Sequence, residues 1–228
     1  MEGAVAVSFE VKVFPADAYA GDAAAVIASA LPRTGSVVIT GGTTGANIYG
    51  AMTSSGSDWS GIEVFFSDER SVPPDHPASN FAMAKRELFD PLGIEGWHRM
   101  RGEDDPEAAA RAYHSELAGA GSAPELILLG MGGDAHIAAL FPGSPALEGT
   151  TQLCRAVDRP DGMRGITLTP PALLAGRKIM LMVTGADKAE AVRRVLTDDE
   201  PPAAAPARLL AGHPDTAFLL DQAAASLL

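Results

Sequence analysis

Short apolar runs alternate with amphipathic segments along almost the whole chain. The apolar runs are bounded by glycine, proline or polar residues, which is typical of buried strands. They lie at residues 5–14, 37–40, 63–67, 126–129, 152–157, 166–169, 178–183 and 216–220. Apolar positions at helical spacing predict helices at 16–30, 44–52, 81–89, 106–118 and 187–196, and a helical turn at 170–174. Strands that alternate with helices favour a parallel sheet covered by helices on both faces.

No internal repeat or linker divides the chain. The stretch at 198–206 is rich in acidic residues, proline and alanine, and we interpret it as a surface loop. A length of 228 residues suits one domain or two small ones. We therefore predict a single α/β domain over residues 1–228, with a three-layer α/β/α, Rossmann-like architecture and a mostly parallel sheet.

One glycine-rich loop carries the clearest candidate chemistry. The apolar run at 126–129 leads directly into Gly-Met-Gly-Gly, which is followed by Asp134 and His136. The exposed N–H groups of such a loop favour an anion. An imidazole with an ordinary pKa of about 6.5 can move protons near neutrality. We predict His136 as a general base oriented by Asp134, with a tight turn whose histidine only caps a helix as the alternative.

The same loop also matches a dinucleotide-binding fingerprint. Gly130, Gly132 and Ala135 fit G-x-G-x-x-G/A after a strand, and Asp158 lies about where the ribose-binding acid is expected. However, Pro142 leaves room for only about two helical turns after the loop, too few for a crossover helix. This disfavours a dinucleotide site.

Three further loops follow predicted strands. They are Gly-Gly-Thr-Thr at 41–44, the segment 68–80 that begins Asp-Glu-Arg, and the turn that leads to Lys188. Because parallel strands end at one edge of a sheet, we expect all four loops to form one site. Each loop also has a purely structural interpretation. Residues 41–44 could be a threonine-capped turn, Asp-Glu-Arg at 68–70 a solvated charge cluster, and Lys188 a lysine that only pairs with Asp187 or Glu190.

Five blocks of the chain, taken in order, resemble the 6-phosphogluconolactonase family. Residues 40–44 are similar to its S-G-G-S-T-P loop, and 66–80 to its D-E-R-x-V-P-x-x-x-x-x-S-N block. Residues 130–143 resemble G-x-G-x-D-G-H-x-A-S-L-F-P-G, and 183–189 resemble V-x-G-x-x-K-A. Residues 164–169 resemble R-I-T-L-T with one extra residue. The resemblance covers nearly all of the chain and implies the three-layer fold of glucosamine-6-phosphate deaminase and ribose-5-phosphate isomerase.

The resemblance also implies an activity and a set of site residues. The reaction is hydrolysis of 6-phospho-D-glucono-1,5-lactone to 6-phosphogluconate in the oxidative pentose phosphate pathway, without cofactor or metal. The expected catalytic residues are His136, Asp134 and Arg70. The expected substrate-binding residues are Gly41, Gly42, Thr43, Thr44, Asp68, Asn80, Gly132, Gly133, Arg164 and Lys188.

Two other functions remain open from the sequence. A glucosamine-6-phosphate deaminase or isomerase would resemble F-N-E-P where this chain has Leu140-Phe141-Pro142, and D-E-Y where it has Asp68-Glu69-Arg70. A non-catalytic sugar-phosphate-binding protein is suggested by Ala135, which replaces the glycine of the family. If that position needs a positive φ, alanine costs about 1–2 kcal/mol and could misplace His136.

Composition and net charge limit the kinds of molecule that the chain is expected to bind. The chain is 46% hydrophobic, and its net charge of −12 disfavours nucleic acid and anionic membranes. The single cysteine excludes an intrachain disulfide, and the first 14 residues lack the pattern of a signal peptide. We expect a cytosolic monomer or small homo-oligomer whose partner is a small sugar-phosphate lactone.

Overall fold

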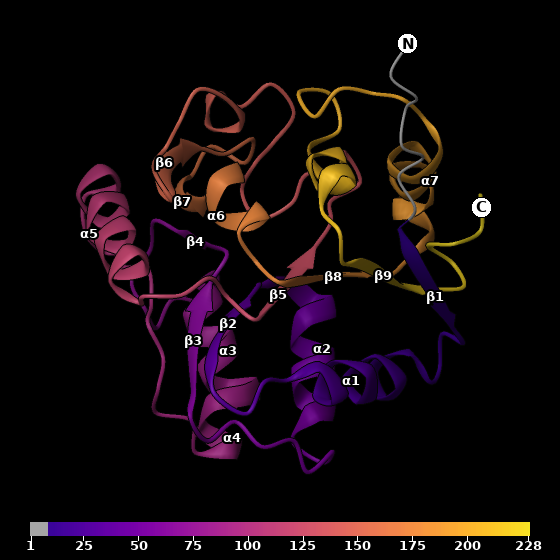
Figure 1. The fold of residues 1–228 in the computed structure, drawn as a ribbon, viewed down its shortest axis with the longest axis horizontal. Helices are drawn as coiled ribbons and strands as arrows, with labels where there is room; N and C mark the ends of the chain where they lie inside the picture. The colour runs from indigo at the N-terminus through magenta and orange to yellow at the C-terminus, as the bar shows by residue number, and fades with distance from the viewer. Residues whose placement is uncertain (1–8) are drawn as a thin grey trace.

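The computed structural model describes residues 9–228, in which nine strands form two sheets (Figure 1). The larger sheet has six parallel strands in the order β1-β9-β8-β5-β2-β3. Their bounds are Glu10–Phe14 (β1), Thr216–Asp221 (β9), Lys178–Val183 (β8), Leu126–Gly130 (β5), Gly35–Ile39 (β2) and Ile62–Phe66 (β3). The predicted strand at 5–14 is described from Glu10 onward, and its residues 5–8 lie outside the described part.

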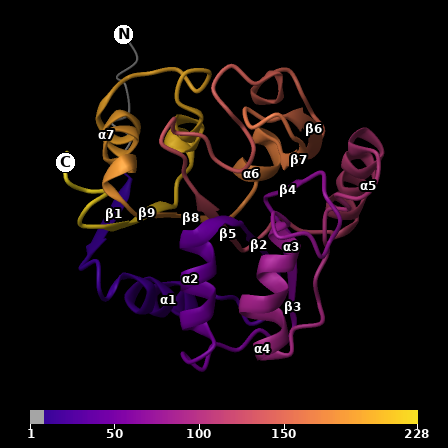
Figure 2. The same cartoon turned by 180° about the vertical axis from the view of Figure 1, so that it is seen from behind.

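Helices cover both faces of this sheet. On one face lie α1 (Tyr19–Ala30), α2 (Gly42–Met52) and α3 (Asn80–Ala84), which continues through a π-helical turn (Lys85–Phe89) into α4 (Asp90–Leu92) (Figures 1 and 2). On the other face lie α5 (Pro106–Gly119), α6 (Pro170–Leu174) and α7 (Ala189–Thr197). Three short 3₁₀ helices span Pro145–Leu147, Ala186–Lys188 and Pro206–Gly212. The three-layer, mostly parallel fold predicted from the sequence is confirmed.

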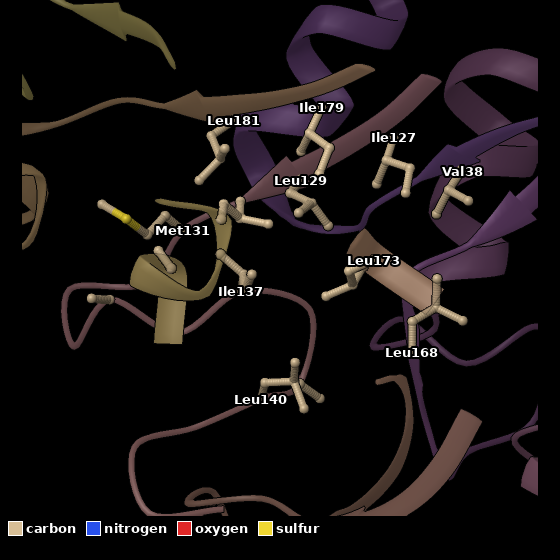
Figure 3. Close-up of a cluster of buried hydrophobic side chains, with 14 of the residues drawn as sticks. Val38, Ile127, Leu129, Met131, Ile137, Leu140, Leu168, Leu173, Ile179 and Leu181 are labelled. Carbon is tan, nitrogen blue, oxygen red and sulfur yellow. The ribbon is translucent and has the colours of Figure 1, made fainter. Parts of the chain in front are cut away.

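The strands are apolar on both faces because each face packs against its own core. Successive residues of β2 show this, since Val37 and Ile39 enter one hydrophobic cluster and Val38 enters the other. Figure 3 shows the second cluster, in which side chains of β2, β5 and β8 face those that follow β5 and those of β7 and α6. The labelled residues are Val38, Ile127, Leu129, Met131, Ile137, Leu140, Leu168, Leu173, Ile179 and Leu181. Burial of each large aliphatic side chain stabilises the fold by about 1.5–3 kcal/mol.

A second, antiparallel sheet corrects two sequence expectations. It consists of β4 (Asp68–Arg70), β7 (Arg164–Leu168) and β6 (Cys154–Asp158) in that order. Residues 68–80 were expected to form a loop throughout, but β4 pairs with β7. The strands expected at 152–157 and 166–169 pair with each other instead of joining the parallel sheet, because the turn between them is too short for a crossover.

The chain passes from one sheet to the other at Ser67. Its N–H donates to the carbonyl of Ile39 on β2, and its carbonyl accepts from the N–H of Leu168 on β7. This transfer carries β4 across the carboxyl edge of the parallel sheet. Among residues 9–228, no helix combines the length and apolar character needed to cross a membrane.

Candidate functional site

The four predicted loops meet at the carboxyl edge of the parallel sheet. β5 lies beside β2, and the chain proceeds from these two strands in opposite directions across the sheet, so a crevice opens between them. A cavity of about 400 Å³ lies there. Its lining residues are Thr40 to Gly45, Asp68, Arg70, Asn80, Gly130 to Gly132, His136, Ala138, Arg159, Met182 to Thr184, Asp187 and Lys188.

The glycine loop after β2 presents the N-terminus of α2 to the cavity. The helix begins at Gly42, and Gly41 caps it without a side-chain hydrogen bond, so the turn is not threonine-capped. A Cβ at Gly41 would lie only 1.8 Å from Oδ1 of Asn80, so only glycine fits there. Thr44 instead bonds Thr184 across the cavity wall, with 2.7 Å between their hydroxyl oxygens. Free N–H groups at a helix start favour an anionic ligand.

Glu69 anchors the acidic block instead of facing solvent. Its carboxylate accepts hydrogen bonds from the N–H groups of Arg70, Asn80 and Phe81 and from the hydroxyl of Ser79. Burial raises the pKa of Glu69 by more than these hydrogen bonds lower it. The carboxylate therefore ties β4 to the start of α3, and the idea of a solvated charge cluster is wrong.

Asp68 and Arg70 flank Glu69 on the opposite face of β4 and line the cavity. The amide of Asn80 donates to the backbone carbonyl of Asp68 at 2.8 Å and to its Oδ2 at 3.2 Å. Arg70 donates through Nη1 to the carbonyl of Ala78 at 2.6 Å. Its Nε is buried and has no hydrogen-bond partner among the described residues.

His136 faces the same cavity and is held by Asp134. Its Nδ1 lies 2.6 Å from Oδ1 of Asp134, and its backbone N–H donates to the same oxygen at 3.1 Å. Partial burial acts to raise the pKa of Asp134, but the hydrogen bonds from His136 hold it below its ordinary value. If Nδ1 donates to this carboxylate, Nε2 is the unprotonated nitrogen, which suits a base. Asp134 itself does not line the cavity.

Ala135 adopts the backbone conformation that the resembled family fills with glycine, with φ +65°. Its N–H donates to the carbonyl of Gly132, and its carbonyl accepts from the N–H of Ala207. Gly132 is required below the imidazole, because a Cβ there would lie 2.1 Å from Nδ1 of His136. These contacts hold the left-handed residue, and His136 still points into the cavity.

Lys188 lines the cavity from the 3₁₀ helix that follows β8. Its Nζ lies 2.8 Å from Oδ2 of Asp187, and its side chain is 28% exposed. A Cβ at Gly133 would lie 3.8 Å from this Nζ, so the lysine lies close to the glycine loop. Gly133 does not line the cavity, and the nearest atom to a Cβ there would be the carbonyl oxygen of Asp187 at 3.2 Å.

Arg164 lies outside the cavity, contrary to the sequence expectation. It is 44% exposed and pairs with Glu107 at 3.1 Å and Asp158 at 3.4 Å. In the β4–β7 ladder Arg70 lies opposite Gly165, so alternation places Arg164 on the other face of β7. The extra residue in this strand has thus moved the arginine to the wrong side.

Sequence reasoning missed Arg159 and Thr184, which both line the cavity. The signal for Thr184 was its place directly after β8. The signal for Arg159 was its place in the turn between two predicted strands, next to Pro160 and Gly162. From the sequence alone, neither residue could be distinguished from an ordinary loop residue.

Several alternatives lose support from the geometry. Residues 131–144 form turns and one isolated bridge between Ile137 and Leu140, so no crossover helix follows β5 and a dinucleotide fingerprint is ruled out. Of the histidines in the described part, His136 alone lines the cavity. Residues 9–228 hold no cluster of three or more His, Cys, Asp or Glu side chains suited to a metal ion.

Comparison with known proteins now decides the family. A family model described as glucosamine-6-phosphate isomerases/6-phosphogluconolactonase matches residues 15–218. The chain belongs to this family. The 6-phosphogluconolactonase of Streptomyces coelicolor is 38% identical over 226 residues, which cover 89% of this chain and 85% of that protein. The 6-phosphogluconolactonase of Synechocystis is 36% identical over 200 residues, 83% of each chain.

Solved structures of the family agree with this assignment. The 6-phosphogluconolactonase of Shewanella baltica has a TM-score of 0.84 and 27% identity, covering 95% of this chain and 98% of that chain. A monomeric glucosamine-6-phosphate deaminase has a TM-score of 0.86 at 22% identity, covering 96% and 100%. The latter likeness shows the shared fold alone.

Proposed function

We propose that this protein hydrolyses 6-phospho-D-glucono-1,5-lactone to 6-phosphogluconate. The observation that carries the proposal is the Asp134–His136 pair, which faces a cavity lined by Arg70, Lys188 and the start of α2. A base, donors for an oxyanion and a clamp for a phosphate are what lactone hydrolysis requires. The chain carries each of them in one cavity.

In the proposed mechanism His136 accepts a proton from water through Nε2, and Asp134 holds the resulting imidazolium. The water oxygen bonds to the lactone carbonyl carbon, and the carbonyl oxygen becomes an oxyanion beside Arg70. The bond from this carbon to the ring oxygen then breaks, and His136 returns the proton to the ring oxygen. The product acid loses its remaining proton to solvent.

Lys188 and the Gly41–Thr44 loop hold the phosphate in this proposal. An ammonium group and the free N–H groups of a helix start both favour a phosphate, and they line the same cavity. Asp68 and Asn80 complete the wall between this loop and Arg70. Gly132 leaves the room that the imidazole requires, and Gly133 lies beside the lysine.

The test compares two substrates of the family. Purified protein should produce 6-phosphogluconate from the lactone well above the spontaneous rate and release no ammonia from glucosamine 6-phosphate. Ammonia release with no lactone turnover would instead assign a deaminase. Binding of 6-phosphogluconate without turnover of either substrate would leave a sugar-phosphate-binding protein.

We also propose that the protein acts in the cytosol as one domain, as a monomer or small homo-oligomer. Its net charge of −12 and its single cysteine support this setting. Light scattering on the purified protein gives the oligomeric state directly.

A further inference from the structure

Arg159 is a third cation of the cavity, and none of the motifs above includes it. It follows β6 and begins the turn that leads into β7, where its N–H donates to the carbonyl of Met163. Its side chain is only 10% exposed, although it lies in a hairpin turn. An arginine in a turn normally extends into solvent, so this burial needs a structural cause.

Gly165 provides that cause. A Cβ at this position would lie 3.1 Å from Cδ and 3.6 Å from Cγ of Arg159. The aliphatic part of Arg159 therefore lies over the bare backbone of Gly165. Because Gly165 is the ladder partner of Arg70, the guanidinium of Arg159 reaches the Arg70 end of the cavity.

Aromatic contacts connect Arg159 to the proposed base. Its guanidinium carbon lies 5.4 Å from the ring centre of Phe141, and that ring lies 4.5 Å from the ring of His136. The guanidinium of Arg159 therefore packs against the same ring as the imidazole of His136.

The guanidinium keeps unused donors. Within residues 9–228 both of its side-chain hydrogen bonds go to Oδ2 of Asp161, at 3.2 Å from Nε and 3.1 Å from Nη2. An arginine has five N–H donors, so three are left for a ligand. The carboxylate of Asp161 is 41% exposed, so water shares in its solvation.

We propose that Arg159, together with Arg70, binds the carboxylate formed at the reacting carbon, and so recognises the C1 end of the sugar acid. This inference rests on the proposed function, which places C1 beside His136 and the phosphate beside Lys188. Two guanidinium groups at one end of the cavity match a carboxylate through forked hydrogen bonds. The phosphate is bound at the other end and does not depend on Arg159.

The test is calorimetric binding of two ligands to the full chain. 6-Phosphogluconate has the carboxylate and the phosphate, whereas sorbitol 6-phosphate has the phosphate alone. Loss of a charge-assisted hydrogen bond should lower the affinity of Arg159→Gln for 6-phosphogluconate by about 10-fold or more. Its affinity for sorbitol 6-phosphate should stay close to that of the unmodified protein.

Two further variants make the result specific. Arg155→Gln removes the same charge from the neighbouring strand β6, but Arg155 does not line the cavity, so both affinities should be unchanged. Arg159→Lys keeps the charge without the fork, and it should also lose affinity for 6-phosphogluconate. Equal weakening of both ligands by Arg159→Gln, or no weakening of either, would overturn the assignment.

The outcome separates this inference from the proposed function. If the unmodified protein binds 6-phosphogluconate but does not turn over the lactone, the proposed function fails and the two-ligand comparison still decides the role of Arg159. If it turns over the lactone while Arg159→Gln keeps full affinity for both ligands, only the inference about Arg159 fails. If it binds neither ligand, the inference about Arg159 fails, and lactone turnover alone decides the proposed function.

Discussion

Replacement of Ala135 by glycine tests the backbone of the catalytic loop. Ala135 has φ +65° and is fully buried. The left-handed conformation costs a residue with a Cβ about 1–2 kcal/mol, which glycine would recover. Glycine would lose about 0.8 kcal/mol from the buried methyl group and about 0.4–1 kcal/mol from the freer unfolded chain. These effects nearly cancel, so we expect Ala135→Gly to change the free energy of unfolding by less than about 1 kcal/mol.

Ala139 is the matched control for this substitution. It is equally buried in the same segment, and its φ is not positive. Ala139→Gly loses the methyl group and the chain entropy without relief of strain, so it should destabilise by about 1–2 kcal/mol. Urea unfolding of both variants measures the difference. If Ala135→Gly is as destabilising as Ala139→Gly, the loop stores no backbone strain and our account of it is wrong.

Three further predictions concern side chains. Lys188→Ala should raise KM for the lactone with little change in kcat if the lysine binds phosphate equally in substrate and transition state; an unchanged KM would remove it from the phosphate site. Arg164→Ala should leave both constants unchanged because this arginine lies outside the cavity, and a loss of turnover would contradict that placement. Burial lowers the pKa of His98, but its hydrogen bonds to Glu116 and Glu63 raise the pKa by more, so it lies above its ordinary value. The stabilisation from protonated His98 is therefore complete below about pH 6.5 and is lost as the pH rises through the elevated pKa, so His98→Gln should destabilise the protein more at pH 6 than at pH 9 in thermal melts.

The parts of the site that follow strands were predictable from the sequence. The loops after β2, β5 and β8 each begin where an apolar run ends, and parallel strands bring such ends to one edge. His136 and Lys188 were placed in one cavity by this topology alone. The motifs contributed the choice of residues within each loop.

The antiparallel sheet was not predictable in the same way. Alternating apolar residues identify a strand but not its direction or its partner, and charged Asp68-Glu69-Arg70 carries no strand signal at all. The position of Arg159 in the cavity wall depends on the missing side chain of Gly165, against which it packs. Such a contact between two segments is known only once the fold is known. The extra residue in β7 likewise places Arg164 on the face of the strand that points away from the cavity, because Gly165 and not Arg164 lies opposite Arg70.

The rate of lactone hydrolysis by His136→Ala tests the central claim most directly. His114→Ala is the control, since His114 lies on α5 outside the cavity and accepts a hydrogen bond from Leu153. After subtraction of spontaneous hydrolysis, we predict that His136→Ala loses about 10²–10⁴-fold in kcat, as expected for a positioned general base, while His114→Ala keeps the rate of the unmodified protein. A His136→Ala variant with an unchanged kcat would contradict the mechanism proposed for this site.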